Sequence, residues 1–172
     1  MDIHKDYTSQ TIKLKPDYEG EVIATLINSK RNVGNRKSVL YLHGYIDYFF
    51  QSHLGAQFIA NGFDFYALDL RKYGRSLLAH QHPNYCKDIA EYFEEITFAI
   101  RQIHESSNGD LFLLGHSTGG LIASNYMNDG QEKELIKGLI LNSPFLDFNQ
   151  NNFKKTLVYL ASKLIADLFP YS

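Results

Sequence analysis

Apolar residues recur along the chain with two different periods, and this pattern predicts short strands separated by helices. Apolar or alternating runs of the length typical of strands lie at residues 11–14, 21–27, 38–42, 63–70, 111–114 and 136–141. Apolar positions spaced three and four residues apart, as on one face of a helix, lie at residues 48–60, 84–106, 117–127 and 153–169. Apolar strands that alternate with helices favour a parallel sheet covered on both faces.

The predicted fold class is therefore α/β, with a mostly parallel sheet of about six strands and helices on both faces. We expect the first two strands to form an antiparallel hairpin at one edge. In open sheets of this kind, functional sites lie beyond the carboxyl ends of the strands. Candidate chemistry is therefore expected just after Leu42, Leu70, Leu114 and Leu141.

Length and composition fit one globular domain and argue against several other classes of protein. The chain has 172 residues, 44% hydrophobic residues and a formal net charge of −2, with both signs interspersed. This balance predicts no nucleic-acid partner. The single cysteine, Cys86, rules out an internal disulfide. The first residues lack the apolar core of a signal peptide and no apolar run is long enough to span a membrane, so we expect a cytoplasmic protein without a transmembrane segment.

The strongest chemical signal follows the strand predicted at 111–114, where the chain reads Gly115-His116-Ser117-Thr118-Gly119-Gly120. This is the G-x-S-x-G pattern of a nucleophile elbow, in which a tight strand-to-helix turn exposes the serine hydroxyl. Glycines two residues on either side relieve the crowding of the backbone, and the helix N-terminus offers free N–H groups to a developing oxyanion. Ser117 is therefore the candidate catalytic nucleophile. A glycine-rich turn without chemistry is the alternative, and no Lys-Ser/Thr pair completes a phosphate-binding loop.

A second loop follows the strand predicted at 38–42 and reads His43-Gly44-Tyr45. A turn at this position is where a second oxyanion donor belongs. We expect the backbone N–H groups of Tyr45 and Thr118 to form the oxyanion hole. For His43 the favoured interpretation is structural, with the imidazole holding the loop by hydrogen bonds.

Two further segments carry weaker signals. The charged loop from Asp69 to Ser76 is predicted to brace its neighbours, with an ordinary solvated turn as the alternative. His80 and His82 fit an exposed loop better than a metal site, because two imidazoles without a set of further ligands are weak evidence for metal binding. We therefore predict no metal and no cofactor.

Taken together, these motifs resemble the α/β-hydrolase superfamily, and in particular its serine aminopeptidase, monoglyceride lipase and lysophospholipase-like group. That group shows an H-G loop, then D-x-x-x-x-G-x-S, then G-H-S-x-G-G. The chain matches them in order with His43-Gly44, with Asp69 to Ser76, and with Gly115 to Gly120. The resemblance covers roughly residues 20 to 150. The segment Tyr45 to Phe50 is bulkier than the small residues common there in monoglyceride lipases.

The resemblance implies a serine hydrolase that cleaves carboxylic esters, lipid-like or other small molecules, through an acyl-enzyme. Ser117 is then the nucleophile, with Tyr45 and Thr118 as oxyanion donors. The residues in supporting roles are His43, Gly44, Gly115, His116 and Gly119. Amide or peptide substrates remain open.

The resemblance also implies that the acid and the histidine of the triad follow the serine, yet no histidine follows His116. We therefore expect residues 1–150 to be the N-terminal part of the hydrolase core and 151–172 to begin a cap or helical segment, with the other triad residues beyond them. The chain itself is then expected to be catalytically poor, and the strand at 136–141 to be an open edge prone to self-association. The alternative is a binding or scaffold protein on an incomplete hydrolase fold.

Overall fold

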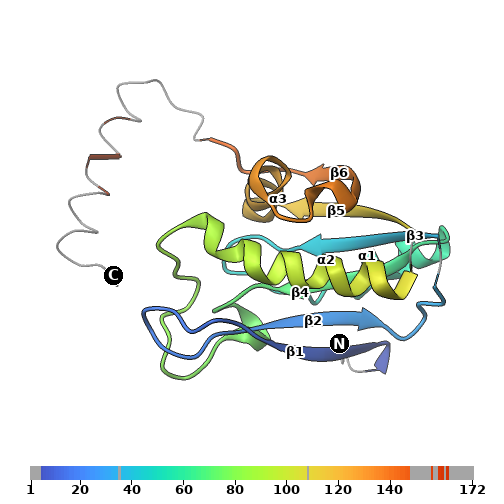
Figure 1. Cartoon of the computed structure of the whole chain (residues 1–172), viewed down its shortest axis with the longest axis horizontal. Helices are drawn as coiled ribbons and strands as arrows, with labels where there is room; N and C mark the ends of the chain where they lie inside the picture. The colour runs from blue at the N-terminus through green and yellow to red at the C-terminus, as the bar shows by residue number, and fades with distance from the viewer. Residues whose placement is uncertain are drawn as a thin grey trace.

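The computed structural model describes residues 5–34, 36–107 and 109–147, together with 156, 159, 160 and 162. These residues form one six-stranded sheet in the order β1-β2-β4-β3-β5-β6 (Figure 1). The strands are β1 (Tyr7–Lys13), β2 (Ile23–Ser29), β3 (Lys37–Leu42), β4 (Asp64–Asp69), β5 (Asp110–His116) and β6 (Ile136–Asn142). The helices are α1 (Ser52–Ala60), α2 (Phe93–Ser107) and α3 (Thr118–Asp129), with short 3-10 turns η2 (Gly74–Ser76), η3 (Ile89–Tyr92) and η4 (Lys133–Leu135).

The pairing of the strands confirms the predicted sheet. Strands β4, β3, β5 and β6 run parallel to one another, whereas β1 pairs antiparallel with β2 and β2 pairs antiparallel with β4. The antiparallel hairpin therefore lies at one edge, as expected. Strand β5 lies between β3 and β6, and β6 has a neighbour on one side only among the residues that the structure describes. The expected open edge is thus present.

Alternate residues along the central strands pack against opposite layers, which confirms helices on both faces. On β3, Val39 and Tyr41 belong to a cluster with α1, whereas Leu40 and Leu42 belong to the larger cluster with α2 and α3. Figure 1 shows α2 lying in front of the sheet. Each fully buried Leu, Ile or Phe in these layers contributes about 1.5–3 kcal/mol of hydrophobic stabilisation. The two clusters hold rigid the strand ends on which the site is built.

The helix predicted at 84–106 begins later than the apolar spacing suggested. Residue Asn84 has a positive φ of 60°, and helical structure begins only with η3, which leads into α2. Asp88 caps this start, because its carboxylate accepts the N–H of Ala90 while the side chain of Glu91 accepts the N–H of Asp88. This reciprocal capping box ends the preceding loop.

The starts of one helix and one strand also differ clearly from the predicted positions, and one predicted helix lies outside the described residues. The helix predicted at 48–60 starts at Ser52, because the backbone of Phe49 is held by the side chains of Asp69, at the end of β4, and Arg75, in the loop after it. Strand β1 begins at Tyr7, four residues before the predicted start, since this edge strand is exposed on both faces and shows little alternation. The helix predicted at 153–169, and with it the proposed start of a cap at 151–172, falls almost entirely outside the described residues.

Candidate active site

Ser117 occupies the turn between β5 and α3 in a backbone conformation that few side chains adopt. Its φ is 52° and its ψ is −120°. A Cβ on Gly115 would lie 2.5 Å from the carbonyl oxygen of Gly119, and a Cβ on Gly119 would lie 2.4 Å from the carbonyl oxygen of His43. Only glycine fits at these two positions, because backbone atoms cannot move aside. The turn therefore has the positive φ and the close packing that the glycine spacing predicts.

The peptide groups on either side of Ser117 are held by residues at the end of β6, just after it and in α3. The N–H of Ser117 donates to the carbonyl oxygen of Asn142 at 3.1 Å. The carbonyl oxygen of Ser117 accepts the N–H groups of Gly120 and Phe145, each at 2.9 Å. The half-buried serine is thus fixed through its backbone.

The loop after β3 lies directly against Ser117. A Cβ on Gly44 would come within 3.2 Å of the Cβ of Ser117. The buried His43 ring accepts the N–H of Leu70 at Nε2 (3.1 Å), so Nδ1 carries the proton and donates to the carbonyl oxygen of Gly44 (2.8 Å). Burial lowers the pKa of His43 and keeps the ring neutral. These are the hydrogen bonds expected of a structural histidine, and they leave no ring nitrogen for proton transfer.

The segment from Asp69 to Ser76 braces that loop, as predicted, and is not a solvated turn. The buried carboxylate of Asp69 accepts the N–H of Phe49 at 2.9 Å and a guanidinium N–H of Arg75 at 2.7 Å. Both terminal nitrogens of Arg75 also donate to the carbonyl oxygen of Phe49, each at 3.1 Å. Ser76 ties the segment to β2 through the hydroxyl of Thr25.

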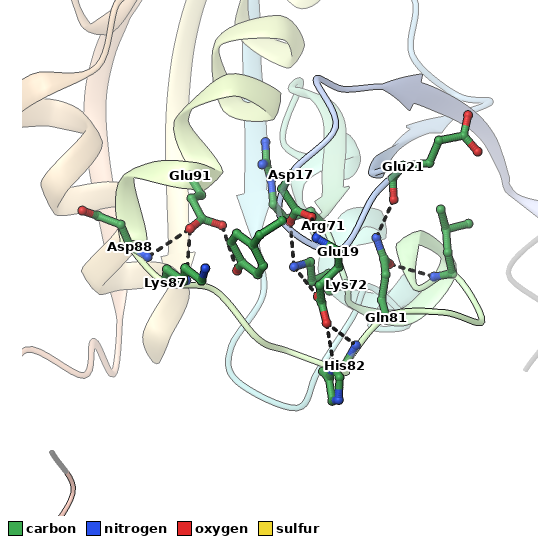
Figure 2. Close-up of polar contacts among 12 residues, drawn as sticks. Asp17, Glu19, Glu21, Arg71, Lys72, Gln81, His82, Lys87, Asp88 and Glu91 are labelled. Carbon is green, nitrogen blue, oxygen red and sulfur yellow. Dashed lines mark hydrogen bonds and ion pairs between the residues drawn. The ribbon is translucent and has the colours of Figure 1, made fainter. Parts of the chain in front are cut away.

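Behind this segment lies a buried ionic cluster that sequence reasoning missed (Figure 2). Lys72 has a φ of 63° and a fully buried side chain, whose Nζ lies 2.7 Å from Asp17 Oδ2 and 2.5 Å from Glu19 Oε2. The ammonium also lies 4.3 Å from the ring centroid of Tyr18. Both acids come from the turn between β1 and β2, so the cluster fastens that hairpin to the loop after β4. In the sequence, the signal available for this cluster was the pair of acids, Asp17 and Glu19, on either side of Tyr18.

Histidine 82 joins the same cluster. Its Nδ1 lies 2.5 Å from Glu19 Oε1, which also accepts its backbone N–H at 3.1 Å. Burial alone would raise the pKa of Glu19, but the hydrogen bonds from Lys72 and His82 outweigh it and hold this pKa at about 2. No group of metal-binding side chains was found among the described residues. Next to Lys72, Arg71 pairs with the fully buried Glu95 of α2 at 2.7 Å.

Exposed apolar side chains lie on the two loops that contact Ser117. We define the apolar rim as the large, exposed hydrophobic residues on the loops that adjoin it: Tyr45, Ile46, Tyr48, Phe50, Phe145 and Leu146. Ile46 is the most exposed of them, at 74%, and has a positive φ of 52°, which is strained for a β-branched residue. Patches of this kind mark binding surfaces more often than ordinary surface does.

Comparison with known families identifies the chain. The model of the family described as serine aminopeptidase, S33, matches residues 34–172. The chain belongs to this family. The match includes the loop at His43, the segment from Asp69 to Ser76 and the turn at Ser117, so the predicted α/β-hydrolase relationship is confirmed. No match was found among curated proteins.

Solved α/β-hydrolase structures share the fold of this S33 family member. A soluble variant of monoglyceride lipase from Saccharomyces cerevisiae, bound to a substrate analogue, is 22% identical with a TM-score of 0.69, covering 96% of this chain and 53% of the lipase. A carboxyl esterase from Bacillus coagulans in complex with glycerol is 19% identical with a TM-score of 0.71, covering 93% and 51%. An epoxide hydrolase from Vigna radiata is 20% identical with a TM-score of 0.60, covering 80% and 40%. The chain thus spans about half the length of the first two proteins.

Within the described part of the chain, no helix combines the length and apolar character needed to cross a membrane.

Proposed function

We propose that this protein is a serine hydrolase of carboxylic esters and that Ser117 is its nucleophile. The observation that carries the proposal is the conformation of Ser117, which combines a positive φ with a place at the N-terminus of α3, immediately after β5. Backbone strain of this kind persists only where the surroundings enforce it, and it is concentrated at functional sites. Here Gly44, Gly115 and Gly119 enforce it by close contact.

In this proposal the hydroxyl oxygen of Ser117 attacks the ester carbonyl, and its proton passes to a general base. The negative charge that develops on the carbonyl oxygen is stabilised by the backbone N–H groups of Thr118 and Tyr45. Support comes from Gly44, which places the chain before Tyr45 against Ser117, and from the start of α3 at Thr118. Collapse of the tetrahedral intermediate expels the alcohol and leaves an acyl-enzyme on Ser117, which water then hydrolyses.

We propose that the general base is a group other than His43 and His116. Both ring nitrogens of His43 are hydrogen-bonded within the loop, and Nδ1 of His116 lies 3.2 Å from the carbonyl oxygen of Asn142. Since no histidine follows Ser117, we propose that the base and its acid belong to a part of the fold that these 172 residues do not span. The 172-residue chain alone is then a poor catalyst, retaining only the ~10³–10⁴-fold rate enhancement that oxyanion donors and binding supply.

The proposed substrate is an ester with an apolar group. The apolar rim supports this, because its exposed side chains lie on the two loops that contact Ser117, where they could bind an apolar group of the ester. The lipase and esterase names of the similar structures point in the same direction.

The decisive experiment is labelling of the full-length protein with a fluorophosphonate probe, which reacts with activated serines. Wild type should be labelled and Ser117→Ala should not. Ser124→Ala is the matched control, since Ser124 lies about two turns further along α3 and its hydroxyl donates to the carbonyl oxygen of Gly120 in its own helix. Labelling that survives Ser117→Ala would overturn the nucleophile assignment. A wild-type protein that is never labelled would favour a binding or scaffold role.

A further inference from the structure

The loop from His43 to Phe49 is anchored at both ends to one short stretch of chain, formed by the last residue of β4 and the segment that follows it. At its start, Nε2 of His43 accepts the N–H of Leu70 at 3.1 Å. At its end, the N–H of Phe49 donates to Asp69 Oδ1 at 2.9 Å. Both anchors are buried and lie on neighbouring residues. The position of this loop relative to Ser117 is therefore set by the segment after β4.

Arg75 completes the second anchor. Its guanidinium donates two hydrogen bonds of 3.1 Å to the carbonyl oxygen of Phe49 and one of 2.7 Å to Asp69 Oδ2. Arg75 and Asp69 together thus bind both the N–H and the carbonyl group of Phe49. The guanidinium carbon also lies 5.2 Å from the ring centroid of Tyr48. A lysine cannot reproduce this arrangement, because it offers a point charge where Arg75 offers a planar fork of donors.

The middle of the loop needs such an anchor, because its backbone is strained. Ile46 has a φ of 52°, and a β-branched side chain is disfavoured in that region. Gly74, itself at a φ of +45°, packs so closely beneath the loop that a Cβ there would lie 2.4 Å from the Cβ of Tyr48. Without its anchors, the loop would relax toward ordinary φ values and carry the N–H of Tyr45 with it.

We infer that Arg75 is a positioning residue, which acts through Phe49 to hold the backbone N–H of Tyr45 in place for the oxyanion. The inference rests on the proposed function and adds a residue that touches no reacting atom. An oxyanion donor is needed in the transition state and little in the ground state. Loss of Arg75 should therefore lower kcat and leave KM nearly unchanged.

The test compares Arg75→Gln and Arg75→Lys with Ser76→Ala as the matched control. Ser76 lies next to Arg75 and makes two buried hydrogen bonds, to Thr25 and to the carbonyl oxygen of Asp69, but none to the loop. In the 172-residue chain, amide hydrogen exchange across residues 43–50 should be roughly tenfold faster in Arg75→Gln than in wild type. Arg75→Lys should show an intermediate rate, and Ser76→Ala should match wild type in this loop. Equal exchange in Arg75→Gln and Ser76→Ala would overturn the inference.

The same variants of the full-length protein should be assayed for hydrolysis of p-nitrophenyl butyrate. We expect kcat of Arg75→Gln to fall by about 10–100-fold, less than complete loss of a donor, with KM changed by less than about twofold. Ser76→Ala should keep the kcat of its folded fraction. A raised KM with unchanged kcat would assign Arg75 to substrate binding and contradict positioning. If wild type fails to turn over, the proposed function fails, whereas the exchange experiment still decides the anchor.

Discussion

The two sides of the segment that follows β4 differ in which side chains they bury and which they expose. On the side of the β1–β2 hairpin, Lys72 and Arg71 bury their charges completely against carboxylates. On the side of Ser117, contacts to the neighbouring loop run through backbone groups such as those of Phe49, and the apolar rim is exposed to solvent. The hairpin side buries its charges in ion pairs, whereas the Ser117 side, apart from the Asp69–Arg75 pair, exposes hydrophobic side chains.

Both sides contain strained backbone, and the difference lies in what the strain achieves. Lys72 and Ser117 have similar φ values of 63° and 52°. At Lys72 the unusual conformation places an ammonium group between two acids, where it is fully buried. At Ser117 it leaves a half-buried hydroxyl at the mouth of the site. The strained backbone therefore anchors the Lys72 ammonium in the ionic cluster, whereas at Ser117 it keeps the residue only half-buried.

The largest effect is expected from Lys72→Met, which removes the cation at the centre of the ionic cluster. The carboxylates of Asp17 and Glu19 would then face each other while nearly buried, at a cost of about 3–5 kcal/mol of unfolding free energy. Lys87→Met is the control, because the exposed Lys87 contacts the same Tyr18 ring at 4.0 Å and should cost less than about 0.5 kcal/mol. Urea denaturation measures both. Equal costs would mean that this side is not held by its charges.

On the side of Ser117, Gly119→Ala should disrupt the contact between α3 and the loop after β3. The new Cβ meets the carbonyl oxygens of His43 and Leu42 at 2.4 and 2.5 Å, so overpacking should cost about 1–3 kcal/mol and displace the turn. Labelling of Ser117 by a fluorophosphonate should fall in the same variant. Gly138→Ala is the matched control, since its nearest neighbour is the Phe112 ring at 3.1 Å, which can shift. Normal labelling of Gly119→Ala would show that this close contact is dispensable.

The ionic side should also impart a pH dependence of stability that originates at Glu19. The pKa of Glu19 is about 2 in the folded protein, below the ordinary value of 4.5. A lowered pKa contributes stability that is present above the ordinary value and is lost as the pH falls toward the folded value. Unfolding free energy should therefore drop more steeply between pH 4.5 and 2 in wild type than in Glu19→Gln. The exposed Glu105 provides the control, Glu105→Gln, and identical slopes in all three proteins would contradict the prediction.

The smallest effect is expected at the apolar rim. Ile46→Asn places a residue that tolerates positive φ where a β-branched one is strained, and it removes an exposed hydrophobic side chain. Stability should rise by about 0.5–1 kcal/mol, measured as a shift in the urea midpoint. Asp47→Asn, at the next position, is the control for a polar change in the same loop. A clear loss of stability in Ile46→Asn would mean that the rim is packed against something in solution.

The presence of six strands, the two covered faces of the sheet and the turn at Ser117 could all be predicted because each depends on local pattern, whereas the order of the strands in the sheet was not predicted. Apolar runs identify buried strands, and glycine spacing reports a backbone conformation directly. The capping box of Asp88 and Glu91 could also have predicted where the helical segment of η3 and α2 begins. The apolar spacing that starts at Asn84 instead suggested an earlier start.

Other features depend on residues far apart in the sequence. The pairing of Lys72 with Asp17 and Glu19 spans more than fifty residues, so nothing local distinguishes this lysine from one on the surface. The loop at Phe49 was predicted as helix for the same reason. Its local spacing favours a helix, and only the distant Asp69 and Arg75 bind its backbone groups in another conformation.

The contacts around Ser117 also carry a consequence for the order in which the molecule folds. The motif Gly115 to Gly119 is short, yet its geometry is completed by Gly44 on one side and by Asn142 and Phe145 on the other. Each of these partners is brought in only by closing a long loop, and long loops close at an entropic cost that must be met before their contacts form. The turn should therefore reach its final conformation late, after β3 and β6 have joined β5. An isolated peptide containing the motif would leave Ser117 an ordinary serine.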